Sequence, residues 1–236
     1  LSLHDALPIS EALAARYPVS VSPSVKDLAE RSDWLFVAVK PYAVAKVLSE
    51  ACLSVRDDAL VISMAAGVTI DAIKTHFAAP PAIVRIMPNL PLKAGCGMTA
   101  ICPDPSVKQA DIDALLALFS SVGRARLIEE RLFDTVTALS GSGPAFAFLF
   151  IESMADGAVL NGMDRAQAYE FAAQTVMGAA KIILESDRHP GELKDIVASP
   201  AGTTMAGIHS LERKAFRAIV MDAVDAAAAR SRELNS

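Results

Sequence analysis

Cysteine and histidine are scarce in this chain of 236 residues, which contains three cysteines and four histidines. Cys52, Cys96 and Cys102 form no CxxC pair, and their odd number does not suit a disulfide framework, so a reducing, cytoplasmic compartment is expected. No histidine lies at metal-ligand spacing from a cysteine, a second histidine or a pair of carboxylates. The sequence therefore predicts neither a metal centre nor disulfide bonds.

Excess positive charge and long apolar runs are lacking as well. The formal net charge is −5, and the 22 lysines and arginines are scattered along the chain, so nucleic-acid binding is not expected. The longest apolar run, 144–151, is followed by Glu152 and Asp156, so no membrane-spanning helix is expected. Hydrophobic residues make up 53% of the chain, which is enough for the core of one large domain or two modest ones.

The segment 1–10 shows neither helical nor strand periodicity and runs abruptly into the amphipathic segment 11–15. It also resembles the translation of a sequencing-adapter oligonucleotide. We therefore expect residues 1–10 to be a non-native segment and exclude them from the fold.

Between residues 19 and 128, short apolar runs alternate with helical patterns. Strands are expected at 19–22, 34–39, 60–65, 82–87 and 98–102, and helices at 24–31, 41–53, 69–77 and 106–121. Unbroken apolar strands that alternate with helices are typical of a parallel sheet covered on both faces. The predicted fold class is therefore α/β, with a doubly wound, Rossmann-like parallel sheet.

The period of the pattern changes near residue 131, and almost everything beyond it is helical. Helices are expected at 143–160, 164–185, 190–197, 204–211 and 212–234. Their many alanines and other small residues favour close helix packing, either within the chain or across a two-fold axis. We therefore expect two domains, a partial dinucleotide-binding domain at 11–130 and an all-α domain at 131–236.

The glycine-rich turn that usually binds a dinucleotide pyrophosphate is missing. None of the 12 glycines lies in a GxGxxG pattern that follows a strand and opens a helix. The expected sheet also begins with the short strand 19–22 rather than with a βαβ unit. The sequence therefore predicts an N-terminally truncated copy, with the missing turn upstream.

Three consecutive strands are expected to end in small, polar or proline-flanked turns, namely Val39-Lys40-Pro41, Met64-Ala65-Ala66-Gly67 and Arg85-Ile86-Met87-Pro88-Asn89. The carboxyl ends of parallel strands form the edge where open α/β sheets bind ligands, so together these turns favour a cofactor cleft. Taken alone, Lys40 is better explained as a solvated lysine in front of a helix-starting proline.

Two runs of small and hydroxyl-bearing residues precede apolar helical patterns, at 138–145 and at 199–204. Free backbone N–H groups at such helix starts can face an anion or a flat ligand. In the second run Gly202, Thr203 and Thr204 would suit a carboxylate, although a simple Ser/Thr helix cap explains the same residues.

Several of these segments occur together and in order in one family. The chain resembles pyrroline-5-carboxylate reductase from about residue 11 to residue 236, through 38–41, 85–89, 95–99, 137–145 and 189–204. Two departures stand out. The family's first strand, glycine-rich turn, first helix and second strand are expected to be absent, and Ala201 occupies a position where a second glycine is usual. The methyl group of Ala201 would fit that turn only if its φ angle were negative.

The resemblance implies reduction of L-1-pyrroline-5-carboxylate to L-proline, the last step of proline biosynthesis, with NADPH or NADH as cofactor. It implies that the substrate carboxylate is held by Ser199, Gly202, Thr203 and Thr204, with the Thr204 hydroxyl beside the imine nitrogen. The residues expected at the cofactor are Ala38, Val39, Lys40, Pro41, Ala65 and Asn89. The resemblance also implies a homodimer formed by the helical halves, with dimers that associate further, commonly to decamers.

Two other functions remain open from the residues alone. A different imine or hydroxyacid dehydrogenase of the same architecture would generally carry a lysine and an asparagine on the first long helix after the sheet, but 146–162 contains no lysine. A non-catalytic helical dimerisation module would need no dinucleotide at all. Neither the preference between NADPH and NADH nor the size of the oligomer can be read from the sequence.

Overall fold

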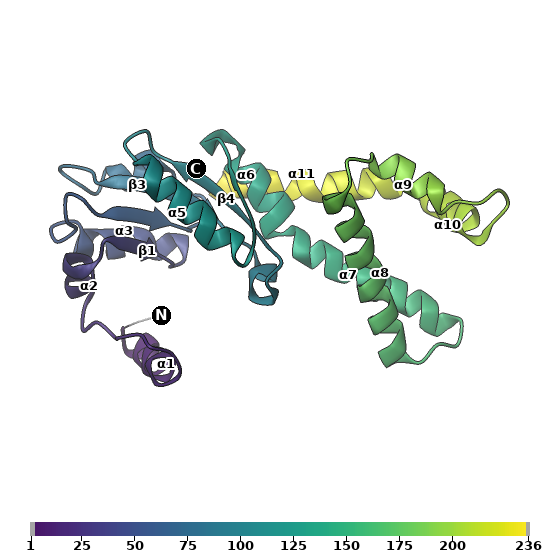
Figure 1. The fold of residues 1–236 in the computed structure, drawn as a ribbon, viewed down its shortest axis with the longest axis horizontal. Coiled ribbons are helices and arrows are strands. Elements are labelled where there is room, and N and C mark those ends of the chain that lie inside the picture. The colour runs from purple at the N-terminus through teal and green to yellow at the C-terminus, as the bar shows by residue number, and fades with distance from the viewer. Residues whose placement is uncertain (1–2, 235–236) are drawn as a thin grey trace. The chain divides into compact units, whose positions relative to one another are not determined.

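The computed structural model describes residues 3–234, with side chains from residue 9 onward. The chain forms two compact units, one that ends at Phe133 and one that spans Asp134–Leu234 (Figure 1). The first unit contains a five-stranded sheet in the order β1-β2-β3-β4-β5. Its strands are β1 (Trp34–Val37), β2 (Leu60–Ser63), β3 (Ala82–Met87), β4 (Gly97–Pro103) and β5 (Gly123–Leu127). Its helices are α1 (Leu3–Arg16), α2 (Val25–Arg31), α3 (Pro41–Ala51), α4 (Ile70–Lys74) and α5 (Gln109–Ser120).

The sheet is doubly wound but not entirely parallel. β1, β2 and β3 are parallel neighbours, as are β4 and β5, whereas β3 and β4 run antiparallel. The expectation of a purely parallel sheet is therefore wrong at one pair. Between β3 and β4 lies only the short 3₁₀ turn η1 (Leu90–Ala94), and a parallel crossover needs a dozen or more residues.

Other expected elements of the first unit are also corrected. Residues 19–22 form no strand, and β5 was not expected at all. In β5 only Ala125 is buried, and the flanking Arg124 and Arg126 hide the strand pattern from a search for apolar runs. The segment 1–10, which shows no helical periodicity and was excluded from the fold as non-native, contributes to α1, which begins at Leu3.

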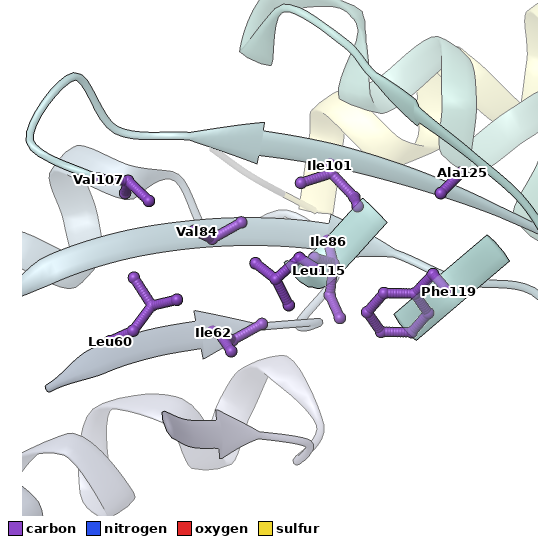
Figure 2. Packing of buried hydrophobic residues seen from close by; sticks show 9 residues of the cluster. All are labelled: Leu60, Ile62, Val84, Ile86, Ile101, Val107, Leu115, Phe119 and Ala125. Carbon is purple, nitrogen blue, oxygen red and sulfur yellow. The ribbon is translucent and has the colours of Figure 1, made fainter. Parts of the chain in front are cut away.

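The sheet is covered on both faces. On one face, Leu115 and Phe119 of α5 pack on the strands in a cluster that Figure 2 shows. The cluster consists of Leu60, Ile62, Val84, Ile86, Ile101, Val107, Leu115, Phe119 and Ala125. Because neighbouring residues of a strand point to opposite faces, Leu35 of β1 packs on the other face, with Ala29 of α2 and Ala51 of α3.

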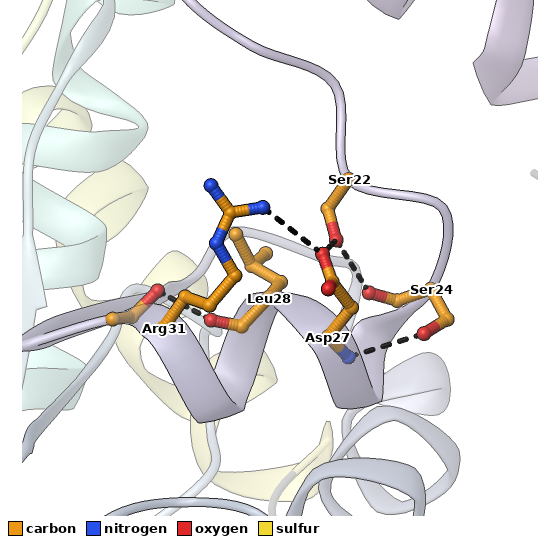
Figure 3. Close-up of polar contacts among 6 residues, drawn as sticks. Ser22, Ser24, Asp27, Leu28 and Arg31 are labelled. Atoms are coloured by element: carbon orange, nitrogen blue, oxygen red, sulfur yellow. Dashed lines mark hydrogen bonds and ion pairs between the residues drawn. The ribbon is translucent and has the colours of Figure 1, made fainter.

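The start of α2 is fixed by a hydrogen-bonded cap, as the sequence predicts for a helix that follows a serine. Ser24 Oγ accepts a hydrogen bond from Asp27 N at 3.1 Å, and Ser22 Oγ lies 2.6 Å from Asp27 Oδ2 (Figure 3). Arg31 lies one turn further along and faces the same carboxylate at 3.5 Å. These contacts fix the first turn of α2, which begins at Val25.

Two ion pairs with a buried member connect elements of the first unit. Arg85 in β3 is 4% exposed, and its Nη1 lies 2.7 Å from Glu130 Oε1. The same oxygen accepts a hydrogen bond from Ile70 N at 2.8 Å, and the Arg85 guanidinium lies 4.5 Å from the centre of the Phe133 ring. In the second pair Lys74 Nζ contacts the buried Asp104, which also accepts from Ser106 Oγ at 2.6 Å.

Acid is expected to weaken the first unit through Asp104. Burial acts to raise the pKa of Asp104, but hydrogen bonds from Lys74 and Ser106 outweigh burial and hold this pKa below its usual range. Since the folded-state pKa is depressed, the stabilisation is present above the unfolded-state pKa of about 3.9 and is lost as the pH falls below it. Asp104→Asn should therefore lower the urea midpoint at neutral pH and reduce its further drop between pH 5 and about 2.5. The exposed Asp57→Asn is the matched control, and an unchanged acid drop in Asp104→Asn would contradict the expectation.

The second unit is helical. It consists of α6 (Phe133–Val136), the π-helical turn η3 (Thr137–Gly141), α7 (Gly143–Leu160), α8 (Arg165–Glu185), α9 (Pro190–Ile196), α10 (Thr203–Arg213) and α11 (Phe216–Leu234). Its buried cluster is small, with Ala155 of α7 against Ala168 and Ala172 of α8. Ser231 of α11 donates a hydrogen bond of 2.6 Å to Asp134.

Many large apolar side chains of the second unit are exposed. Leu160 is 87% exposed, Met221 71% and Phe171 64%. The helical stretch Glu130–Leu160 is also long and apolar enough to cross a membrane by length and composition, so the expectation that no such stretch exists is wrong by that criterion. Glu152 and Asp156, which follow the apolar run 144–151, do not prevent the stretch from meeting this criterion. Apolar helix surface of this kind needs a cover that one copy of the unit does not supply.

Candidate active site

A cavity of about 730 Å³ lies in the first unit, where the carboxyl ends of β1 and β2 meet the start of α3. This is the edge at which open α/β sheets bind ligands. The residues that line the cavity are Val25, Ala38, Val39, Lys40, Pro41, Tyr42, Ala43, Lys46, Val47, Glu50, Met64 and Ala66. The walls are mostly apolar with a few charged groups, as is usual for the site of a small organic ligand.

The predicted cofactor residues divide into two groups. Ala38, Val39, Lys40 and Pro41 all line the cavity. Ala65 does not, because its neighbours Met64 and Ala66 face the cavity while Ala65 is buried. Ala65 N donates to Ser63 Oγ at 3.3 Å. Asn89 also lies outside the lining, and its Oδ1 accepts a hydrogen bond of 2.9 Å from Met98 N across the β3–β4 connection.

The start of α3 has no side-chain cap, although Pro41 has no N–H and Ala43 N already donates to Lys40 O at 2.9 Å. Lys40 is the N-cap residue, with φ −64° and ψ 150°, and its side chain makes no capping hydrogen bond. Pro41 occupies the first helical position, where a missing N–H costs nothing. Uncapped N–H groups at a helix start attract anions.

The second predicted site is the turn that precedes α10, in the second unit. Gly202 N donates to Ser199 O at 3.0 Å, which closes a four-residue turn through Pro200 and Ala201. Gly202 is the N-cap residue of α10, and no side chain caps the helix there. The helix α10 has eleven residues, and Thr203 and Thr204 are its first two. Its N-terminus therefore has two hydroxyl-bearing residues, with Ser199 in the turn before it. Hydroxyl groups beside such an N-terminus suit a carboxylate.

Comparison with known proteins finds similar proteins that cover nearly the whole chain, including both candidate sites. The chain is 45% identical to the pyrroline-5-carboxylate reductase of Escherichia coli (strain K12), over 95% of this chain and 83% of that protein. It is 47% identical to the pyrroline-5-carboxylate reductase of Methanosarcina acetivorans, over 96% of this chain and 84% of that protein. The chain belongs to the pyrroline-5-carboxylate reductase family. This membership excludes the alternative of a different dehydrogenase of the same architecture.

Family models and a solved structure match the two units separately and together. The model for pyrroline-5-carboxylate reductase dimerisation matches residues 130–234, and the model for NADP oxidoreductase coenzyme F420-dependent matches residues 9–67. The crystal structure of Plasmodium falciparum pyrroline carboxylate reductase with NADP bound is 34% identical and has a TM-score of 0.86. The match covers 93% of this chain and 84% of that one.

The first hydroxyl-rich run of the chain, 138–145, is not an open helix start. Ser142 N donates to Thr137 O at 2.8 Å and Ala145 N to Ser142 O at 2.9 Å. The helix is continuous from α6 through η3 into α7, so the expectation of free N–H groups here is wrong. A π-helical turn inside a helix is common at functional sites and adds one residue to the turn.

Ala201 adopts a backbone conformation that the sequence argument did not allow. Its φ is +56°, whereas a negative value was expected. With Pro200 before it and the Ser199–Gly202 hydrogen bond closed, Ala201 occupies the third position of a turn of type II, which requires a positive φ. An L-residue with a side chain pays for that conformation with about 1 kcal/mol.

Replacement of Ala201 by glycine is therefore expected to stabilise the second unit by about 0.5 kcal/mol, the relief of strain less the larger entropy of an unfolded glycine. Ala215, with φ +55° after the end of α10, offers a matched control outside the turn. Urea unfolding of Ala201→Gly and Ala215→Gly, at the same protein concentration, measures the change in the free energy of unfolding for each variant. Destabilisation by Ala201→Gly would contradict the strain that we describe.

The cavity also contains residues that the sequence argument missed. Tyr42, Lys46 and Glu50 lie on α3 and line the cavity beyond Lys40. The signal was available, because their spacing of four residues places them on one face of a helix.

Proposed function

We propose that this chain catalyses the reduction of L-1-pyrroline-5-carboxylate to L-proline with NADPH or NADH. The observation that carries the proposal is the 45% identity to the Escherichia coli reductase over 95% of the chain. We further propose the cytoplasm as its location.

The cavity in the first unit fits the dinucleotide. Its volume of about 730 Å³ lies in the range of small-molecule sites, and small or apolar walls allow a flat base and a ribose to approach the backbone. Lys40 and the uncapped start of α3 supply positive charge for phosphate. In this proposal Ala38, Val39, Lys40 and Pro41 contact the cofactor, while Ala65 and Asn89 support the cofactor site from behind.

The turn before α10 is proposed to hold the substrate. Gly202, Thr203 and Ser199 bind the carboxylate through backbone N–H groups and hydroxyls, since a helix N-terminus favours an anion. Thr204 is the second residue of the helix and places a further hydroxyl at this end. Its Oγ1–H donates a hydrogen bond to the ring nitrogen.

The reaction needs orientation and charge placement rather than a nucleophile. When bound, the reduced nicotinamide supplies a hydride from its C4 to the carbon of the C=N bond. The substrate-binding turn fixes the carboxylate, which leaves the ring one orientation. The Thr204 hydroxyl assists the proton that the ring nitrogen must gain, so the product is a neutral ring amine that can take up a second proton from water.

Self-association is part of the proposal. We propose that the exposed apolar faces of α7, α8 and α11 are buried against a second copy of the chain, and that such homodimers associate further, up to a decamer. The exposure of Leu160, Met221 and Phe171 supports this arrangement, because their burial between copies would stabilise the dimer. The apolar stretch 130–160 would then serve the dimer rather than a membrane.

The activity is tested with a chimera, because the 236 residues contain no GxGxxG turn for the pyrophosphate. In this chimera the first βαβ unit of the Escherichia coli reductase precedes residue 11. We expect pyrroline-5-carboxylate-dependent oxidation of NADPH and formation of proline, with far lower turnover for the 236 residues alone. A chimera that binds NADPH but forms no proline would overturn the proposed function.

The role of Thr204 is tested by Thr204→Val in the chimera. Valine keeps the shape and removes the hydroxyl, so kcat/KM for pyrroline-5-carboxylate should fall by about 1–3 kcal/mol in transition-state terms. Thr203→Val is the matched variant and should have the smaller effect on kcat, since its proposed partner is the carboxylate. Wild-type kinetics in a normally folded Thr204→Val chimera would reduce Thr204 to a helix residue without a catalytic role.

A further inference from the structure

The last two turns of α10 border a hollow of about 250 Å³ in the second unit. In Figure 1, α10 is the yellow-green helix that follows α9. The spacings of three and four residues among the lining residues place them on one side of the helix. These residues are Ala206, His209, Ser210, Arg213 and Lys214. We call this hollow the α10 pocket.

The apolar residues of α10 lie on a different side of the helix. Thr204, Ile208 and Leu211 follow one another at spacings of four and three residues, so they share a face. At 3.6 residues per turn, Arg213 lies about 140° around the helix from Ile208. A second copy of the chain that covers the apolar face therefore does not have to cover the α10 pocket.

The α10 pocket has positive charge without a counter-charge. Within residues 9–234, the side chains of His209, Arg213 and Lys214 form neither an ion pair nor a hydrogen bond. The acidic residue of the same turn, Glu212, is paired with Arg217, whose Nε lies 2.8 Å from Glu212 Oε1. The lining itself contains no carboxylate. Charge that no carboxylate neutralises is available to an anion.

The dipole of α10 explains only part of this pattern. Cations at the end of a helix are favoured by the partial negative charge of its last carbonyl groups, which accounts for Arg213 and Lys214. It accounts neither for the hollow nor for His209 and Ser210, which lie one turn earlier. The same partial negative charge acts against an anion, so binding of an anion here depends on the two cations.

The donors of the α10 pocket suit a phosphate group. The guanidinium of Arg213 presents paired N–H donors in a plane that matches two phosphate oxygens, and Lys214 adds a second charge. The imidazole N–H of His209 and the hydroxyl of Ser210 are donors for the remaining oxygens. The volume of about 250 Å³ lies below the roughly 300 Å³ at which sites for drug-sized ligands begin. A phosphate with a small organic part therefore fits, and a dinucleotide does not.

We propose that the α10 pocket binds a single phosphate group, either inorganic phosphate or the phosphate of a small monoester. Arg213 and Lys214 neutralise its charge, and His209 and Ser210 orient it. The site is separate from the cavity in the first unit, and it does not depend on the proposed reaction.

The test is a titration of the 236-residue chain at constant pH and about 0.15 M salt, which screens weak surface attraction. Inorganic phosphate and glycerol 3-phosphate are the two probes, and binding is measured by calorimetry and by the NMR signals of the histidine imidazoles. We expect saturable binding and a shift of the His209 signal, which is assigned by its loss in His209→Gln. Tighter binding of glycerol 3-phosphate would identify the ligand as a monoester. Equal or tighter binding of inorganic phosphate would identify it as the free ion, and either result supports the site.

Substitutions in the pocket test each donor. Arg213→Gln and Lys214→Gln should each weaken binding about tenfold, because each removes a charge-assisted hydrogen bond, and Ser210→Ala should weaken it about threefold. Arg188→Gln is the matched control, since it removes the charge of an exposed arginine of the second unit outside the pocket, and it should change nothing. Lys40→Gln, at the cavity of the first unit, should leave the response of the His209 signal unchanged. Unchanged urea midpoints would show that the variants lose binding and not folding.

Several results would overturn the inference. One is the absence of saturable binding of both probes, and another is a His209 signal that does not respond. Equal weakening by Arg188→Gln and Arg213→Gln would show that the phosphate is attracted by net charge and not by the pocket. The competing occupant is an acidic side chain of a second copy of the chain. In that case Arg213→Gln would lower the mass of the oligomer in sedimentation velocity and leave phosphate binding unchanged, which also counts against the site.

Discussion

A Gly202→Ala chimera is expected to fold normally and to lose at least about 100-fold in kcat/KM for pyrroline-5-carboxylate. A Cβ on Gly202 would lie only 3.1 Å from Ser199 O and within van der Waals overlap of Ser199 Oγ. The Ser199 side chain must then rotate away, and the turn that presents the Thr203 and Thr204 N–H groups must open. Loss of about 1 Å in the placement of a substrate has effects of this size.

Steady-state kinetics with each substrate varied in turn measures the effect. The KM for NADPH should not change, since Gly202 is not part of the cavity in the first unit. Gly207→Ala is the matched control, because a Cβ there meets nothing within 4 Å, and alanine within a helix is more favourable than glycine. Undiminished kcat/KM in Gly202→Ala would mean that the substrate carboxylate is held elsewhere.

The second large effect is expected from Arg85→Ala, which should destabilise the first unit by about 3 kcal/mol. The substitution removes a buried guanidinium that pairs with Glu130 and stacks on Phe133. It leaves the Glu130 carboxylate without its counter-charge, which is the costly part. We take the lower end of the usual range for a broken buried pair because the Glu130 side chain is 32% exposed.

Equilibrium unfolding in urea at a fixed protein concentration measures this loss. Arg85→Met combined with Glu130→Gln is the informative control, because it removes both charges and keeps most of the packing volume. It should recover at least half of the lost stability. A loss below about 1 kcal/mol in Arg85→Ala would show that the pair contributes no more than an exposed ion pair does.

Local sequence patterns predicted the central elements of the fold well. The mostly apolar segment 82–87 became β3, and the pattern at 143–160 became α7, each with the expected bounds. The antiparallel direction of β4 was not predictable from its residues, because direction depends on how little chain joins it to β3. β5 was not predicted because an edge strand with one buried residue has no apolar run.

The candidate site shows the same division between local and non-local information. The sequence predicted the segment 38–41 because strand ends are chemically distinctive, and all four residues line the cavity. It did not predict that Ala65 is buried, which depends on the packing of the sheet. The positive φ of Ala201 results from closure of a turn by a hydrogen bond. The general preference of residues with a side chain for negative φ led to the opposite prediction.

The position of β1 in the sheet has a consequence for how the protein behaves in solution. Among the described strands, β1 pairs with β2 and with no other, so the N–H and C=O groups on its far side are unmatched. Its residues, Trp34-Leu35-Phe36-Val37, carry no charge and no proline, the usual protections of a sheet edge. Such an edge accepts a further strand from any chain that offers one. A strand supplied within the same molecule would saturate the edge, whereas at high concentration copies that lack one would join edge to edge and aggregate.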